Sequence, residues 1–401
     1  MAYLLSSIFD IRSGITIIRI HQMKNYPKMK NNHRQKDYQL ESPIGSRVII
    51  NGQEVDYFSG TGYLGLQSHP DVLKAAADTL ARYGLSTATS RGGFGEHPVY
   101  HWLEQEACAY FNTEKALFFP SGYMGMSVLV QTNGSGSDHI FIDSAAHYSL
   151  WDAALAANKT ITPFHHVNPG HLEEIIRSEI LPDEHPLVIS DAVFPISGEI
   201  APLPDYLKII EPFNGRIFLD DAHGVGVLGE NGRGILEYFN IQSDRVKTCG
   251  TLAKALGGYG GIIAGPGDWI DEMDQNSSIC IGASPPPLVT AAASARALTI
   301  ARENPRLRRQ LWANVKQARD GLRSLGWELD DTPVPIICLP SLQGQNLASV
   351  QKQLFAQGFA VAYVRSYSST PAGGALRVAV CAQHTSDQIN RLVDTMKNLA
   401  L

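Results

Sequence analysis

The sequence predicts an α/β protein with a mostly parallel central sheet covered by helices and a smaller α/β domain at the C-terminal end. Between residues 116 and 264, short segments that are apolar throughout alternate with amphipathic segments. A strand that is apolar on both faces is typical of a parallel sheet buried between helices. With 401 residues, 44% of them hydrophobic, the chain is also long enough to divide into two domains.

Changes in pattern divide the chain into three segments. Residues 1–45 are predicted to form an exposed N-terminal arm, because a short apolar stretch interrupted by charges is followed by a basic, asparagine-rich segment. We assign residues 46–289 to the large domain and residues 290–401 to the small one. The apolar stretch is too short to span a bilayer and lacks the cleavage site of a signal peptide, so no integral membrane segment is expected. Later methionines are alternative starts, which leaves open whether residues 1–28 belong to the natural protein.

Short elements precede the central sheet. The segment 48–58 is predicted to be two strands joined by an Asn-Gly turn, a pair that favours hairpins. Helical spacing of apolar residues follows at 70–83 and at 97–111. Between these helices, residues 84–95 are rich in glycine and small hydroxyl side chains, which excludes a regular element. Such a loop is usually a connection, and its length also suits a binding loop.

The elements of the central sheet and of the C-terminal part follow in order. Strands of the sheet are predicted at 116–119, 139–143, 187–190, 216–219, 247–250 and 261–264, with helices after residue 121 and at 146–157 and 203–212. Two long helices are predicted at 288–303 and 306–325, followed by strands near 334–339, 359–364 and 375–381. Ligands of parallel sheets bind at the carboxyl ends of the strands. These ends are expected to carry Ser121, Asp143, Asp220 and Thr251.

The composition argues against several classes of function. The net charge of −6 and the lack of a dense basic cluster give no indication of nucleic-acid binding. The five cysteines are widely spaced and include no C-x-x-C motif, so neither a disulfide framework nor a metal site is indicated. A cytoplasmic location and small-molecule chemistry fit these features.

A lysine and an aspartate mark the candidate active site. Lys254 lies between Thr251 and a run of glycines, and a lysine whose amine is partly desolvated can form a Schiff base. By itself this pattern is also that of a surface lysine beside a turn. About thirty residues upstream, the apolar strand at 216–219 leads into Asp220-Asp221-Ala222-His223. An acid and an amine in this arrangement are what pyridoxal 5'-phosphate requires of its protein.

A larger set of motifs appears between residues 46 and 398. In chain order they are Phe58-Ser59 through Tyr63-Leu64-Gly65-Leu66, Ser90-Arg91 with Gly95 and His97, Leu103-Glu104, Ser121-Gly122-Tyr123, Asp143 with His147, Asp220-Asp221-Ala222-His223, Thr251-Leu252-Ala253-Lys254-Ala255-Leu256-Gly257, and Leu376-Arg377 with His384-Thr385. This ordered set resembles the α-oxoamine synthases, pyridoxal-phosphate transferases of fold type I. The resemblance implies an acyltransferase that condenses an acyl-CoA with a small amino acid and releases carbon dioxide. It also implies a homodimer with active sites at the subunit interface.

The resemblance implies a role for each residue of the cofactor site. Lys254 would bind the cofactor and then act as acid or base at the substrate α-carbon, and Asp220 would pair with the pyridine nitrogen. His223 would hydrogen-bond the ring hydroxyl. His147 would stack on the ring; the alternative for this histidine is a cap of its own helix. The phosphate would be bound by Ser121, Gly122, Tyr123 and Thr251.

Substrate-binding residues are implied as well. Arg377 lies in an otherwise apolar strand and would bind the substrate carboxylate through two parallel hydrogen bonds, although a lone strand arginine also pairs with structural acids. The further residues implied at the substrate site are Arg365, Thr61 and Ser90. The loop at 84–95 and the turn at 282–284 would cross into the neighbouring subunit.

Departures from the family pattern concern the choice of substrates. Met126 and Thr61 stand where the family usually has asparagine, and Pro195 stands where serine is common. These changes predict a more apolar acyl entrance, because methionine adapts to a chain. Among the activities that the resemblance implies, we expect that of an 8-amino-7-oxononanoate synthase. A medium- or long-chain aminoketone synthase, a 2-amino-3-ketobutyrate CoA ligase and a plain aminotransferase are the alternatives, while Lys254 argues against a non-catalytic partner subunit. Acyl-chain length, pathway and the choice among alanine, serine and glycine stay open.

Overall fold

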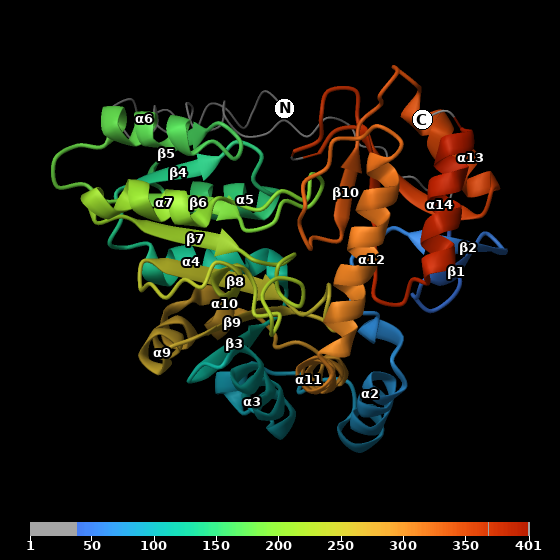
Figure 1. The fold of residues 1–401 in the computed structure, drawn as a ribbon. Helices are drawn as coiled ribbons and strands as arrows, with labels where there is room; N and C mark the ends of the chain where they lie inside the picture. Colours follow the sequence, from blue (N-terminus) through green and yellow to red (C-terminus); the bar gives the residue numbers. More distant parts are fainter. Residues whose placement is uncertain (1–37, 368, 400–401) are drawn as a thin grey trace, which may run out of the picture.

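The computed structural model describes residues 38–367 and 369–399 (Figure 1). Residues 1–37 of the predicted exposed arm therefore lie outside the described residues. The rest of that segment runs along a strand, because Leu40 forms an antiparallel bridge with Ile50 and the Glu41 N–H donates to the Ile49 carbonyl at 2.8 Å.

A seven-stranded sheet forms the larger layer of the molecule (Figure 1). Its order is β3 (Lys115–Phe119), β9 (Gly261–Gly265), β8 (Val246–Thr251), β7 (Arg216–Asp220), β6 (Pro186–Asp191), β4 (His139–Asp143) and β5 (Thr160–Phe164). The strands from β8 to β5 pair in parallel, whereas β9 is antiparallel to both of its neighbours. The predicted mostly parallel central sheet is confirmed.

Helices cover both faces of this sheet. One face packs on α4 (Gly125–Asn133), α5 (Tyr148–Ala156), α9 (Gly267–Asn276) and α10 (Ser278–Gly282), and the other on α3 (Pro98–Phe111), α6 (Pro169–Glu179), α7 (Leu203–Ile210) and α11 (Leu288–Glu303). Side chains alternate between these two layers. In β4, Ile140 and Ile142 pack on the face that α4 and α5 cover, and Phe141 packs on the opposite face. Shorter elements are η1 (Leu66–Ser68), η2 (Arg91–Gly93), η3 (Gly122–Met124), η4 (Glu211–Phe213) and α8 (Ile235–Tyr238).

A five-stranded sheet combines two strands from residues 47–58 with three strands from residues 336–379. Its order is β1 (Arg47–Ile50), β2 (Gln53–Phe58), β11 (Phe359–Val364), β12 (Ala375–Ala379) and β10 (Ile336–Leu339), and its helices are α12 (Arg306–Arg323), α13 (Leu347–Ala356) and α14 (Ser386–Asn398). β2 runs parallel to β11, with Asp56 opposite Phe359. The sequence assigned the hairpin at 48–58 to the large domain, but its sheet partner lies in residues 290–401. Pairing with so distant a strand leaves no local signal; the domain limits themselves stay a prediction.

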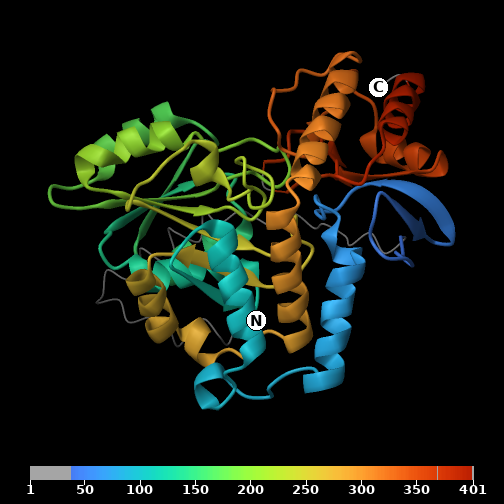
Figure 2. The ribbon, with the colours of Figure 1, turned by 60° about the horizontal axis from the view of Figure 1, so that its bottom comes forward.

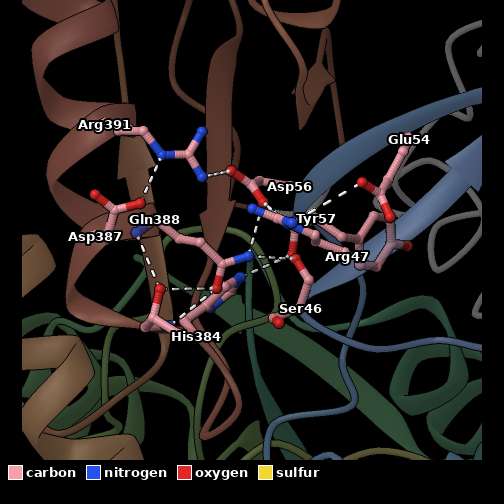
Figure 3. A network of polar contacts seen from close by, with 10 residues as sticks. Ser46, Arg47, Glu54, Asp56, Tyr57, His384, Asp387, Gln388 and Arg391 are labelled. Carbon is pink, nitrogen blue, oxygen red and sulfur yellow. Dashed lines mark hydrogen bonds and ion pairs between the residues drawn. The ribbon is translucent and has the colours of Figure 1, made fainter.

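A buried aspartate ties this hairpin to the last helix (Figure 3). Asp56 on β2 is 3% exposed, and its carboxylate accepts hydrogen bonds from Arg47 Nε at 2.9 Å and from Gln388 Nε2 at 2.7 Å. Arg391 forms an ion pair with the same carboxylate. Burial opposes ionisation of Asp56, but these partners outweigh it and hold the pKa of the carboxyl below its ordinary value.

Long helices connect the two sheets. α2 (Pro70–Tyr83) and α3 lie beside α11, and α12 continues from the end of α11 toward the five-stranded sheet (Figure 2). The helix predicted at 146–157 begins at Tyr148 because His147 is its N-cap. β5 was not predicted; its Pro163 interrupts the apolar pattern and is tolerated because β5 is an edge strand. None of the described helices is long and apolar enough to cross a membrane.

Candidate active site

A cavity of about 400 Å³ opens at the carboxyl ends of the parallel strands. Most of the predicted site residues line it, namely Thr61, Ser121, Gly122, Tyr123, His147, Asp220, His223, Thr251, Lys254 and Arg377. The structure thus brings together side chains from both sheets and from the loops that follow β3, β4, β7 and β8.

Lys254 lies in a tight loop after β8. The loop is closed by backbone hydrogen bonds from the Leu252 N–H to the Gly260 carbonyl at 3.0 Å and from the Gly258 N–H to the Leu252 carbonyl at 2.8 Å. Gly257 has φ +64°, and a Cβ there would lie 2.3 Å from the Gln67 nitrogen, so the loop requires glycine. Burial lowers the pKa of Lys254 even though Asp220 and Asp191 oppose this. A larger share of the neutral, nucleophilic amine is therefore present than at a surface lysine.

The two adjacent aspartates at the end of β7, Asp220 and Asp221, point to different environments. The Asp220 carboxylate lines the cavity and accepts the Ala222 N–H at 2.9 Å. Asp221 instead accepts the Ile235 N–H at 2.7 Å, and its burial raises the pKa of its carboxyl well above the ordinary value. Asp220 is thus the carboxylate available to a ligand in the cavity, and Asp221 holds the following segment in place.

His223 is held by a tyrosine that the sequence did not single out for a role. Its Nδ1 lies 2.8 Å from the Tyr63 hydroxyl. Burial lowers the pKa of His223 well below its ordinary value, and the charges of Lys254 and Arg377 act in the same direction. A neutral imidazole results, which can share a hydrogen bond with a ligand hydroxyl.

His147 has the capping role that the sequence gave as its alternative, and the residue also lines the cavity, while its stacking on the cofactor stays a prediction. It caps α5, because Nδ1 accepts the Ser149 N–H at 3.2 Å and lies 2.7 Å from the Ser149 hydroxyl. Burial lowers the pKa of His147. Since Nδ1 accepts, the neutral ring carries its proton on Nε2, and this N–H is the donor left for a ligand in the cavity. The rings of Tyr123 and Tyr367 meet the imidazole edge-on at 5.8 and 6.0 Å.

The start of η3 and α4, directly after β3, lies at one side of the cavity. Ser121 is the N-cap, and its hydroxyl accepts the Tyr123 N–H at 3.3 Å. A Cβ on Gly122 would lie 2.7 Å from Thr251 Cβ, so only glycine permits this close approach. Backbone N–H groups at a helix start bind anions, so these residues would hold the phosphate group of pyridoxal phosphate, as the resemblance implied. The Thr251 hydroxyl already donates to the Gly260 carbonyl at 2.9 Å, so its predicted bond to phosphate stays a prediction.

Arg377 projects from β12 and has carbonyl rather than carboxylate partners. Nε donates to the Pro195 carbonyl at 2.7 Å, Nη1 to the Gly60 carbonyl at 3.2 Å, and Nη2 to the Tyr63 hydroxyl at 3.4 Å. No acid among the described residues forms an ion pair with it, which argues against the structural alternative. Arg377 is 7% exposed, and a buried guanidinium that no described carboxylate neutralises suits an anionic ligand.

Three predicted residues lie away from the cavity. Arg365 is exposed, and Ser90 caps η2, where its carbonyl accepts the N–H groups of Gly93 and Gly95. The expectation that Met126 widens the acyl entrance was wrong. Met126 is 1% exposed and packs in the core between the sheet and α5, because α4 turns it away from the cavity.

The sequence also missed cavity residues. Asp191 ends β6 in register with Asp220 on β7, and its Oδ2 accepts a hydrogen bond from the backbone N–H of His147 at 2.8 Å. Burial, followed by the charge of Asp220, raises the pKa of Asp191 well above its ordinary value. Asp191 stands at the end of an apolar strand, as Asp220 does, so the sequence contained the same signal for both residues. Tyr367, which also lines the cavity, lies in a loop without any pattern.

Comparisons with known proteins agree with this site. Residues 58–396 match the family model of aminotransferase class I and II. The 8-amino-7-oxononanoate synthase of Methylococcus capsulatus is 33% identical over 89% of this chain and 92% of the relative, and 8-amino-7-oxononanoate synthase 1 of Bacillus subtilis is 33% identical over 93% and 95%. The solved serine palmitoyltransferase of Sphingomonas wittichii shares the fold with a TM-score of 0.84, at 23% identity over 98% of this chain and 97% of that one.

The chain belongs to the aminotransferase class I and II family and, within it, to the α-oxoamine synthases. It has the fold-type I transferase architecture that the resemblance implied. The protein is a pyridoxal-phosphate-dependent acyltransferase.

Proposed function

We propose that the protein joins the acyl group of an acyl-CoA to a small amino acid and so makes an α-amino ketone. The thioester C–S bond and the bond from the α-carbon to the carboxylate break, a C–C bond forms, one proton is taken up, and CoA and carbon dioxide leave. The observation that carries this proposal is the meeting of Lys254, Asp220 and Arg377 at one cavity.

Each residue has a task that its surroundings allow. Pyridoxal phosphate, when bound, would supply a ring that can accept electrons from the substrate α-carbon. Lys254 would anchor the cofactor aldehyde and move a proton at that carbon, and Asp220 would hold a proton at the pyridine nitrogen. Arg377 binds the amino-acid carboxylate. The Nε2–H of His147 polarises the thioester carbonyl.

Acyl specificity is the part of the function that an assay must decide. Thr61 and Pro195 line the cavity without the amide and hydroxyl common in the family, which favours an apolar chain. Each buried methylene is worth about 0.8 kcal/mol, so two further carbons favour a longer acyl-CoA by roughly tenfold.

The test is thiol release with alanine, serine or glycine across acyl-CoAs of increasing length, pimeloyl-CoA included. We expect thiol and carbon dioxide in equal amounts, with kcat/KM rising from acetyl-CoA to medium chains. A preference for acetyl-CoA with glycine would instead indicate a 2-amino-3-ketobutyrate CoA ligase. Amino-group transfer without thiol release would indicate a plain aminotransferase.

We also propose that two copies of the chain form the active protein. Phe94 is fully exposed and has φ +70°, an unusual backbone conformation for a bulky residue. Leu85 and Ile281 are 61% and 57% exposed, and the Leu288 N–H donates to the Leu85 carbonyl at 3.0 Å. These apolar side chains suit a second copy, which would receive Ser90 on the same loop. Sedimentation should show a dimer, and Phe94→Glu should weaken it; an active monomer would contradict the proposal.

A further inference from the structure

Three segments that are distant in sequence meet at His166, outside the set of residues that line the cavity. Nδ1 of its ring lies 3.0 Å from Asp143 Oδ1 at the end of β4, and Nε2 lies 3.0 Å from Glu199 Oε2. Because each ring nitrogen faces a carboxylate, both nitrogens carry protons and the ring is a cation. Burial opposes this charge, but the two carboxylates outweigh it and raise the pKa of His166 to about 9.

The backbone beside His166 is strained to hold this arrangement. Val167 has φ +49°, a conformation that β-branched residues rarely adopt. Its N–H donates to Asp143 Oδ2 at 2.9 Å, so one fully buried carboxylate fixes both the ring and the strained residue. Strain of this kind persists only where the surrounding contacts impose it, and it is concentrated at functional sites.

A turn between Phe194 and Glu199 connects this network to Arg377. Glu199 shares this turn with Pro195, since the Phe194 N–H donates to the Glu199 carbonyl at 3.0 Å. The Phe194 ring also meets the His166 ring edge-on at 4.3 Å. The Pro195 carbonyl then accepts from Arg377 Nε at 2.7 Å, the shortest of the three hydrogen bonds that orient the guanidinium.

We propose that Asp143, His166 and Glu199 form a positioning network that fixes the Pro195 carbonyl and thereby aims Arg377 at the carboxylate of the amino acid. The inference rests on the proposed function, because it takes the amino acid to be the ligand of Arg377. None of the three network residues lines the cavity. They act on substrate binding through the turn, and the acyl-CoA and the cofactor are bound by other residues.

The test compares His166→Gln and Glu199→Gln with the wild type. Both variants keep the size of the side chain and remove one charge. We expect the KM for the amino acid, and its Kd from absorbance titration without acyl-CoA, to rise about tenfold, because a charge-assisted hydrogen bond is misaligned rather than lost. The KM for acyl-CoA, the visible spectrum of the cofactor and the kcat at saturating amino acid should stay within twofold of the wild type.

His139→Gln is the matched control. His139 begins the same strand that Asp143 ends, and its Nε2 bonds the Thr162 hydroxyl at 2.8 Å away from the cavity. It should leave the amino-acid Kd unchanged. If the wild type is active and both variants bind the amino acid with its Kd, the inference alone is overturned. If the wild type shows no amino-acid-dependent thiol release, the proposed function is overturned and the inference with it. If His166→Gln fails to fold, Glu199→Gln decides, since the Glu199 side chain is 43% exposed and tolerates replacement.

Discussion

Adjacent residues of the same type have different tasks in this site. Asp220 ends β7 and Asp221 follows it, yet Asp220 lines the cavity and Asp221 accepts a hydrogen bond from the Ile235 N–H. The sequence alone favoured Asp220 by resemblance. The structure adds the physical reason, because successive side chains after a strand point in different directions and only one can reach the ligand.

This division predicts different effects of two matched substitutions. Asp220→Asn should lower kcat at least a hundredfold while the protein still binds the cofactor, since an amide cannot hold a proton at the pyridine nitrogen. Asp221→Asn should stay within about fivefold of the wild type, because the amide oxygen can still accept the Ile235 N–H. The measurement is kcat at saturating substrates, with bound cofactor followed by absorbance. Equal activity of wild type and Asp220→Asn would refute the assigned role.

Site residues differ in how far a sequence can reveal them. Lys254, Asp220, His223 and Arg377 were predicted because each belongs to a motif. Tyr63 as the partner of His223 was not, since the 2.8 Å contact joins residues from different parts of the chain. Met126 was misjudged because a departure from a family pattern does not tell which way a helix turns the side chain.

At the scale of elements, the hairpin of β1 and β2 joins the N-terminal part of the chain to the C-terminal sheet. Asp56 holds the hairpin to α14 through its contacts with Gln388 and Arg391, and it also bonds Arg47 on β1 (Figure 3). Removing one member of a buried ion pair costs 3–5 kcal/mol in general, and the partial exposure of both arginines reduces this to about 2 kcal/mol.

Asp56→Asn should therefore lower the Tm by several degrees at pH 7 without changing the KM values. The pKa of Asp56 is lowered in the folded protein, so its contribution is full above the ordinary value of 3.8 and is lost as the pH falls through the lower folded value. The gap in Tm between wild type and variant should narrow below about pH 4. Glu54→Gln is the control, because Glu54 is exposed and lies 3.9 Å from Arg47. A constant gap at all pH values would contradict this account.

For the whole molecule, the sequence predicted the parallel central sheet better than the pairing of strands that are distant in the chain. The parallel strands were visible because each is apolar on both faces, as in β6, which is buried at every position. The pairing of β2 with β11 was not visible, since register between distant strands leaves no periodic signal. β5 was missed because Pro163 and two threonines break the apolar run. The cavity follows from the sheet, but its outer wall depends on the turn at Pro195 and the loop of Tyr367.

Lys254, as the residue proposed to anchor the cofactor, is central to the proposed chemistry. Borohydride reduction of the wild type, followed by peptide mass spectrometry, should place a pyridoxyl phosphate mass on the peptide that contains Lys254. Lys254→Ala should lose both this label and thiol release, whereas Lys247→Gln, at a lysine on β8 whose amine lies 4.3 Å from the Trp269 ring centroid, should keep both. Normal turnover in Lys254→Ala, or a label on another lysine, would contradict the account.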